Sequence, residues 1–549
     1  MFRHARAALR TITRRTAVPS LATCEGLIVG GPDEFPGIKV SEVMEGRVRF
    51  VGLPAVDLGT DVDWCSDPHG NRSWAMNLHA LRWVGRLVVE HERSGGRDLL
   101  ARAAEISEDW VRKNPRGGAG VSPWAWAEHP IALRAPALVR LSAHVRTAWL
   151  SDSLVEHARL LSDPALYRQG HNHGLDQDIA LLAIGCRLGH EPWRDLAVRR
   201  MTASAELAID AQGALREQAP RYGIYVHRRL GTALEALRRS GAEIPAGLAE
   251  RRAALEAYIG HATQPDGRLV PIGDSPADTR PAGFAPEEAT VGVFDDGYVF
   301  GRTAWNDPRS AYYSIRFGPG RGFHGHEDHL GVTYHAHGRD ILVEAGFHSY
   351  ERTAYRAWTT SPEAHNVPFV VDAEFRGGTA TRLVGSSLRR TRQSYRLTDD
   401  AYGVSRTRTV LVNHGADLMA VLDEVPPGAT LRNRWHLAPS LRVVSNRDGR
   451  VVLADGDWRA TLVQLAMPSC RPRGGQAAQP GTISLGYLRN TETTTLLSPA
   501  ARSLLTLVVP GTGDPEVSHS AGRLTVGTPA GPVSFTFSLD LPCPATAAG

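Results

Sequence analysis

The sequence has little cysteine, almost no lysine and no long hydrophobic run. Its five cysteines lie far apart without a CxxC pair, which argues against a disulfide framework and against a cysteine-rich zinc site. Nearly all of the 62 basic residues are arginine, since lysine occurs only at Lys39 and Lys113. Arginine forms bidentate pairs with carboxylates and sulfates, so the composition is compatible with an acidic ligand. No window is long and apolar enough to predict a membrane span.

The charges nearly balance. With 62 basic and 58 acidic residues the net charge is +4, and no strong basic field marks a nucleic-acid-binding protein. The N-terminus is rich in arginine, but Cys24 and Glu25 interrupt its single apolar stretch, which is too short for a signal peptide. We therefore expect residues 1–50 to be a disordered leader and the protein to be cytoplasmic, although secretion stays open.

The remaining chain divides into two halves of different pattern. From about Trp74 to His261, apolar residues recur at helical spacing, as in "SWAMNLHALRWVGRLVVEH" and "DQDIALLAIGCRLG". Residues 264–290 are rich in Pro, Gly and Asp and are typical of a connector. After them, short alternating segments such as "SAYYSIRF", "TRTVLVNHG" and "SLLTLVVP" predict strands. We expect a helical domain over 51–263 and an antiparallel β-sandwich over 291–549.

The first candidate site in the helical half is the segment "GHNHGLDQD", which precedes an apolar helix. In one interpretation it is a polar helix start with Asn172 as the N-cap. In the other, Asn172 and His173 point into a cleft and donate hydrogen bonds to an anionic group.

Two further segments of this half carry side chains suited to an acidic saccharide. Tyr222 stands where a helix is expected to begin, after "GALREQAPR", and Glu217 and Arg221 are close enough in sequence to tune or orient it. A tyrosine in this place is more often a packing residue.

The segment "SPWAWAEHPIALR" supplies Trp124, Trp126 and Arg134. Indole faces bind sugars and arginine binds carboxylates, although core packing explains at least one of the two tryptophans as well.

In the β half, "FHGHEDHLG" places His324 and His326 two residues apart, on one face of an extended segment. Glu344 in "DILVEAG" and His365 in "SPEAHNVPF" follow downstream. Two imidazoles and one carboxylate form a suitable ligand set for zinc with one open position. Scattered surface histidines explain the same residues equally well.

Taken in order, "NLHALRW", "GHNHG", "REQAPRY", "DGRLVPIGDS", "HGHEDHL…GRDILVEAG" and "SPEAHNVPFVVD" resemble the heparinase II/III-like polysaccharide lyases. The resemblance implies an N-terminal (α/α) toroid and a C-terminal β-sandwich. It also implies β-elimination at uronic acid residues of an acidic polysaccharide or oligosaccharide.

The resemblance assigns roles to four residues. It implies that Asn172 and His173 bind the uronate carboxylate, that Tyr222 is the general acid, and that His324 or Tyr222 is the base. A free tyrosine has a pKa of about 10, so a base role for Tyr222 needs nearby positive charge, for which Arg221 and His173 are candidates. Trp124, Trp126, Arg134, Glu217 and Arg221 are the expected substrate-binding residues.

The resemblance also implies a structural zinc ion held by His326, Glu344 and His365. The family usually has Asp in place of Glu344, and histidine is common where Gly223 stands. Two other functions stay open. A cupin-type metal-dependent oxygenase or isomerase shares the ligand types, although its glutamate follows the HxH pair more closely. A non-catalytic glycan-binding protein could keep the same fold.

Overall fold

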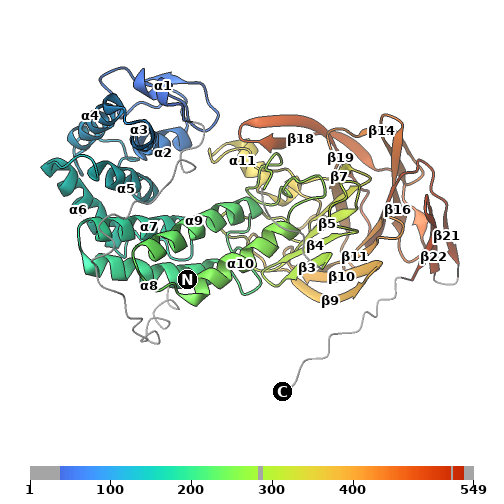
Figure 1. The fold of residues 1–549 in the computed structure, drawn as a ribbon. Coiled ribbons are helices and arrows are strands. Elements are labelled where there is room, and N and C mark those ends of the chain that lie inside the picture. The colour runs from blue at the N-terminus through green and yellow to red at the C-terminus, as the bar shows by residue number, and fades with distance from the viewer. Residues whose placement is uncertain (1–37, 282–288, 521–522, 537–549) are drawn as a thin grey trace. The chain divides into compact units, whose positions relative to one another are not determined.

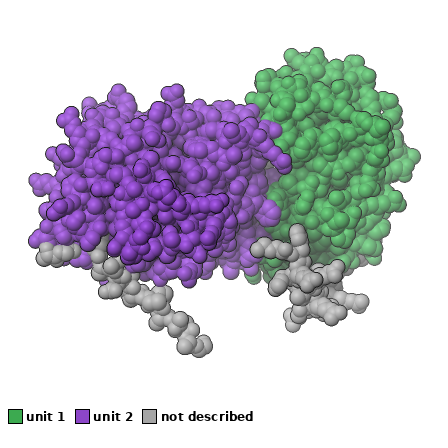
Figure 2. All heavy atoms as spheres, turned by 180° about the vertical axis from the view of Figure 1, so that it is seen from behind, with its two compact units in different colours: residues 1–207, 228–250 green, residues 208–227, 251–549 purple. Residues whose placement is uncertain are grey.

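The computed structural model describes residues 38–281, 289–520 and 523–536. The chain forms two compact units, which Figure 2 shows in different colours. Unit 1 comprises Met1–Leu207 and Arg228–Glu250, and unit 2 comprises Ala208–His227 and Arg251–Gly549. The predicted helical domain over 51–263 is therefore shared between both units.

Unit 1 is built almost entirely of helices (Figure 1). Its elements are α1 (Val40–Met44), β1 (Arg47–Val48), β2 (Val56–Asp57), α2 (Arg72–His79), α3 (Arg82–Ser94), α4 (Arg97–Lys113), α5 (Glu128–Ser142), α6 (Ala148–Ser162), α7 (Asn172–Arg187) and most of α8 (Glu191–Ala208). Helices α9 (Pro220–Arg239) and α10 (Ala246–His261) each contribute to both units. Helices α5 and α7 pack against each other and are buried along most of their length.

The expected leader over residues 1–50 is wrong for its last part. Residues 1–37 lie outside the described residues, but α1 and β1 are formed, and Val43, Val48 and Phe50 are buried. Within the described residues, the packed part of unit 1 therefore already includes Val43, whereas the prediction placed its start at residue 51.

The long apolar segment from Trp74 to His91 forms two helices instead of one. Leu81 stands between α2 and α3 with a φ of +48°, in the left-handed region that only a tightly packed position imposes on a leucine. Beyond it, Trp83, Val84 and Leu87 are buried at helical spacing.

Unit 2 consists mainly of antiparallel strands. They are β3 (Val291–Phe294), β4 (Tyr298–Arg302), β5 (Tyr312–Arg316), β6 (Val332–Ala336), β7 (Arg339–Leu342), β8 (Pro368–Val370), β9 (Arg382–Arg389), β10 (Arg392–Asp399), β11 (Arg406–Asn413), β12 (Leu418–Glu424), β13 (Leu431–His436), β14 (Arg442–Arg447), β15 (Arg450–Asp455), β16 (Trp458–Ala466), β17 (Arg471–Pro472), β18 (Ala477–Gly486), β19 (Arg489–Leu497), β20 (Ser503–Pro510), β21 (Val517–Ser520), β22 (Arg523–Thr528) and β23 (Gly531–Phe535). One short helix, α11 (Ala354–Thr359), lies between β7 and β8 in sequence.

The largest sheet has the order β14-β15-β16-β20-β12-β11-β10-β9, with β17 paired to β16. The other sheets have the orders β3-β4-β5-β6-β7, β18-β19-β13-β8 and β21-β22-β23. Strand β11 explains the layering, because Val410 and Val412 face one core while Leu411 between them faces another. The first core joins the large sheet to the five- and four-stranded sheets, and the second joins it to β22 and β23.

The predicted fold class, a helical (α/α) toroid followed by an antiparallel β-sandwich, is confirmed. Within the described residues no helix combines the length and apolar character needed to cross a bilayer. Cys65, Cys186 and Cys470 are free thiols.

Candidate active site

Tyr222 is the third residue of α9, whose first residue is Pro220. Proline suits this position because its fixed φ matches the helix and its missing N–H needs no partner there. The Arg221 backbone N–H donates to Ser275 Oγ at 3.1 Å and ties the helix start to the connector. The start of α9, which carries Arg221 and Tyr222, is therefore attached to the connector through Ser275.

His324 is held by backbone hydrogen bonds from both sides. Its N–H donates to the Glu217 carbonyl at 3.0 Å, and the Asp274 N–H donates to the His324 carbonyl at 2.9 Å. Gln218, which has a φ of +62°, donates from Nε2 to the carbonyl of Gly320 at 3.1 Å. The loop that carries His324 is thus fastened to the chain on the N-terminal side of Tyr222.

Asp274 connects both histidines of the HxH pair to an arginine. His324 Nδ1 lies 3.1 Å from Asp274 Oδ2, and His326 Nε2 lies 3.0 Å from Oδ1. Arg356, from α11, reaches Asp274 with both terminal nitrogens, one of them at 2.9 Å. Although burial opposes ionisation, these hydrogen bonds hold the pKa of Asp274 far below its usual value. An ionised Asp274 accepts the Nδ1 proton of His324 and leaves Nε2 to react.

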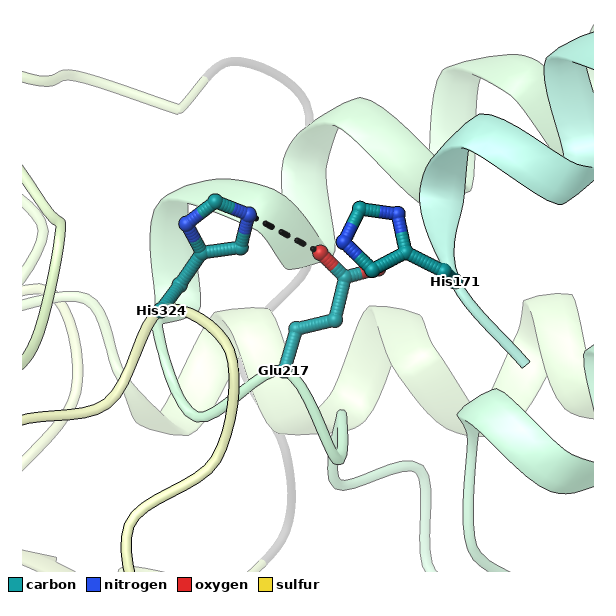
Figure 3. A group of neighbouring side chains, drawn as sticks. All are labelled: His171, Glu217 and His324. Atoms are coloured by element: carbon teal, nitrogen blue, oxygen red, sulfur yellow. Dashed lines mark ion pairs between the residues drawn. The ribbon is translucent and has the colours of Figure 1, made fainter. Parts of the chain in front are cut away.

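Glu217 lies on the other side of the His324 ring. Its Oε2 atom is 3.4 Å from His324 Nε2, and its side chain is fully buried (Figure 3). A carboxylate in this place stabilises the imidazolium that forms when Nε2 takes up a proton. Glu217 was predicted to bind substrate. In unit 2 its carboxylate lies beside the imidazole of His324.

Tyr222 packs face to face on His324, with ring centroids 3.6 Å apart and planes inclined by 11°. The phenol oxygens of Tyr222 and Tyr350 are in hydrogen-bonding contact. Burial raises the pKa of Tyr222 well above 10, and the neighbouring Tyr350, Asp274 and Glu217 raise it further. Burial likewise raises the pKa of Tyr350. Both shifts favour the protonated phenol of Tyr222, which is the form that a proton donor needs.

In unit 1, Asn172 and His173 begin α7. The N-cap is His171 rather than Asn172, since His171 Nδ1 accepts the N–H of His173 at 3.1 Å. His173 stacks on His129 at 3.6 Å, and its Nδ1 lies 3.2 Å from Glu128 Oε1. The hydrogen bond from His173 lowers the pKa of Glu128 to about 2, whereas burial lowers the pKa of His173. The contact with Glu128 thus orients the ring of His173.

Of the saccharide contacts predicted in "SPWAWAEHPIALR", Arg134 is a core residue. Arg134 is fully buried, lies 3.8 Å above the Trp110 ring and donates from Nε to His157 Nε2 at 2.8 Å. Trp126 donates from Nε1 to the Asn114 carbonyl at 3.0 Å. Burial removes Arg134 from any direct contact with a substrate, which corrects that expectation.

Trp124 is half-buried, with the guanidinium of Arg72 at 5.9 Å from its ring. Trp126 is half-buried as well, so burial does not distinguish the two rings as sugar contacts.

The three predicted zinc ligands come from three segments of unit 2 and are nearly fully buried. His365 Nδ1 contacts Glu344 Oε2, and the His326 and His365 ring centroids are 5.3 Å apart. His365 Nε2 is buried and has no hydrogen-bond partner among the described residues. This donor set suits zinc. In the described chain, however, the three residues do not bring one ligand atom each within 4.8 Å of the others.

The sequence analysis gave no role to three residues that lie around His324 and Tyr222: Asp274, Tyr350 and Arg356. Asp274 lies 50 residues before His324, so no local spacing connects the two. Its one signal is the segment "IGDS", where Gly273 has a φ of +57° and passes close to the His324 carbonyl.

Known structures share this fold. A mutant of the heparan sulfate lyase HepC from Pedobacter heparinus has a TM-score of 0.69 and 16% identity, over 91% of this chain and 89% of that chain. A heparinase III structure has a TM-score of 0.73 and 16% identity, over 87% and 86%. A chondroitin AC lyase from Streptomyces coelicolor A3, in complex with chondroitin sulphate, has a TM-score of 0.50 and 12% identity, over 82% and 78%.

No curated protein sequence matches this chain. Two family models do, and together they span most of it. The model described as heparinase II/III N-terminus matches residues 41–294, and the model described as heparinase II/III-like, C-terminal, matches residues 305–522. The chain belongs to the heparinase II/III-like family.

Proposed function

We propose that this protein is a lyase that cleaves a uronic-acid-containing polysaccharide or oligosaccharide by β-elimination. The observation that carries the proposal is the stack of Tyr222 on His324, in which one ring is kept protonated and the other has its tautomer fixed by Asp274. This places a proton donor beside a proton acceptor, as elimination requires.

The reaction removes the proton on C5 of the uronate and breaks the bond between C4 and its oxygen. His324 Nε2 takes the C5 proton, and Glu217 at 3.4 Å stabilises the resulting imidazolium. Tyr222 gives its phenolic proton to the departing C4 oxygen, and its hydrogen-bonding contact with Tyr350 holds the hydroxyl in place. Proton uptake and proton release are thereby assigned to different residues.

The C5 proton becomes acidic only when the adjacent carboxylate is neutralised. By family resemblance, this role falls to Asn172 and His173 of unit 1. The contact of His173 with Glu128 fixes the orientation of its ring. The proposed pair would stabilise the charge that builds up on the carboxylate during proton removal.

A zinc ion held by His326, Glu344 and His365 belongs to the proposal as a structural element. When bound, zinc would fix the segments that carry these three side chains. No step of the elimination needs it, since His324 and Tyr222 supply both proton transfers.

The substrate class is an acidic glycan of glycosaminoglycan type. Heparan sulfate lyase and heparinase III share the fold over most of both chains, and the structure of the chondroitin AC lyase contains chondroitin sulphate. The family match over both halves does not favour the cupin alternative, which leaves the helices unexplained. A glycan-binding protein without activity is the remaining alternative.

Elimination leaves a double bond conjugated to the carboxylate, which hydrolysis does not produce. The test is ultraviolet absorbance during incubation with heparan, chondroitin and alginate polymers and their oligomers. A rise on one of these that is absent in Tyr222→Phe supports the proposal. Binding of a glycan with no rise across the panel would identify a glycan-binding protein instead.

A further inference from the structure

The β9–β10 hairpin carries an unusual density of arginine. Between Gly377 and Thr398 the chain has five arginines and no acidic residue, so this segment holds more net positive charge than the whole protein, which is +4. The five are Arg382, Arg389, Arg390, Arg392 and Arg396, here called the arginine face. β9 is the edge strand of the large sheet and β10 is its neighbour (Figure 1).

The burial pattern of β10 shows which way these side chains point. Gln393, Tyr395 and Leu397 are buried, whereas Arg392 is exposed and Arg396 is half-buried. Because alternate residues of a strand face opposite sides, Arg392 and Arg396 share the outer face. Arg389 lies directly opposite Arg392 in the register and is also exposed.

This arrangement does not help the fold. Like charges placed directly across an antiparallel pair are destabilising, and Arg389 and Arg392 are such a pair. On the neighbouring strand, Arg406 and Arg408 are each paired with a buried aspartate. Within the described residues, no carboxylate forms an ion pair with Arg389, Arg390 or Arg392. The positive charges of Arg389, Arg390 and Arg392 are therefore left for an external anion.

We propose that the arginine face binds the acidic polysaccharide outside the catalytic residues, as a second contact for long chains. This inference rests on the proposed function for the identity of its ligand. Guanidinium groups pair with carboxylates and sulfates in bidentate geometry. Arg392 and Arg396 are about 13 Å apart along an extended strand, with Arg389 about 5 Å to the side, so that a linear polyanion can contact several of them. Clustered basic residues of this kind are typical of heparin-binding patches.

Arginines on an edge strand can also serve only to prevent pairing between sheets of different molecules. The two roles predict different results. If the face only protects the edge, its removal promotes aggregation and leaves the affinity for polyanions unchanged. If it binds the polysaccharide, its removal weakens binding in protein that stays monodisperse.

The experiment compares the full-length triple variant Arg389→Ser, Arg390→Ser, Arg392→Ser with wild type by titration calorimetry. The probe is long heparin chains at low and high salt, with neutral dextran and duplex DNA as comparison polymers. The matched control removes the same charge from the other end of the large sheet and its β17 extension, with Arg442→Ser, Arg447→Ser and Arg471→Ser.

We expect the hairpin variant to bind long heparin about tenfold more weakly at low salt, with a shallower dependence on salt, and the control to bind as wild type does. Unchanged affinity, equal losses in both variants, or a loss confined to DNA would overturn the inference. Calorimetry needs no turnover, so a protein that binds through the arginine face but cleaves nothing would refute the proposed function alone.

Discussion

Asp274→Asn is the substitution that tests the site most sharply. Asparagine keeps the shape of the side chain but offers one acceptor oxygen where the carboxylate offers two. Asp274 now contacts His324 on one oxygen, His326 on the other, and Arg356 on both. An amide NH2 group placed against His324 Nδ1 would favour the tautomer with the proton on Nε2. That tautomer cannot accept the C5 proton.

The size of the effect follows from these contacts. A histidine locked in the wrong tautomer by an Asp-to-Asn change costs about 10⁴-fold in kcat in a serine-protease triad. We expect a loss of about 10³-fold or more here, in kcat more than in KM, because the substrate contacts are unchanged. The variant also leaves the half-buried Arg356 without its counter-charge, which costs on the order of 2 kcal/mol of stability.

Asp340→Asn is the matched control. Asp340 is also a carboxylate of unit 2 that accepts from a histidine, His335 at 2.9 Å, and from an arginine, Arg268 at 2.6 Å. We expect a similar loss of thermal stability in this variant, with kcat near that of wild type. The assay is initial rate from ultraviolet absorbance, with thermal melts of all three proteins. If Asp274→Asn is folded and its kcat stays within about threefold of wild type, the positioning role of Asp274 is refuted.

Three further outcomes are expected. Tyr222 stays protonated to above pH 10 because it is buried, so the difference in tyrosinate absorbance between wild type and Tyr222→Phe should be flat below pH 10; a tyrosinate signal at pH 8 would contradict this. Burial and Arg134 lower the pKa of His157 from 6.5 to about 3. On acidification the unfolded state therefore takes up this proton first, and the free energy of unfolding falls between pH 6.5 and about 3, by at most about 5 kcal/mol. In His157→Gln the free energy of unfolding should depend less on pH over this range. Purified protein should contain about one zinc per chain by elemental analysis and melt at lower temperature after chelation, with both effects lost in His365→Ala; metal-free protein of unchanged stability would refute the zinc site.

The strands were predictable because their patterns report burial directly. In β20, the quoted segment "SLLTLVVP" is mostly apolar and every residue is buried, so the sequence displays the burial without reference to other segments. The break at Leu81 was not predictable, because a leucine with positive φ follows from packing around it rather than from its own preference.

The site could be predicted only in part. The HxH pair and Tyr222 stand in recognisable local segments, whereas Asp274 and Tyr350 reach His324 and Tyr222 through the fold. Arg134 shows the opposite error. An arginine close to two tryptophans in sequence suggested a sugar site, yet the helices bury it against Trp110, which is distant in sequence. Residue types near one another in sequence therefore indicated the chemistry but not which groups face solvent.

The most direct measurement is the ultraviolet absorbance of wild-type protein acting on a uronate polymer, beside Tyr222→Phe and His324→Gln. The account predicts a rise for wild type and losses of at least about 10²-fold in both variants, because each removes one of the two proton transfers. Folded Tyr222→Phe and His324→Gln proteins that both produce the chromophore at the wild-type rate would contradict it.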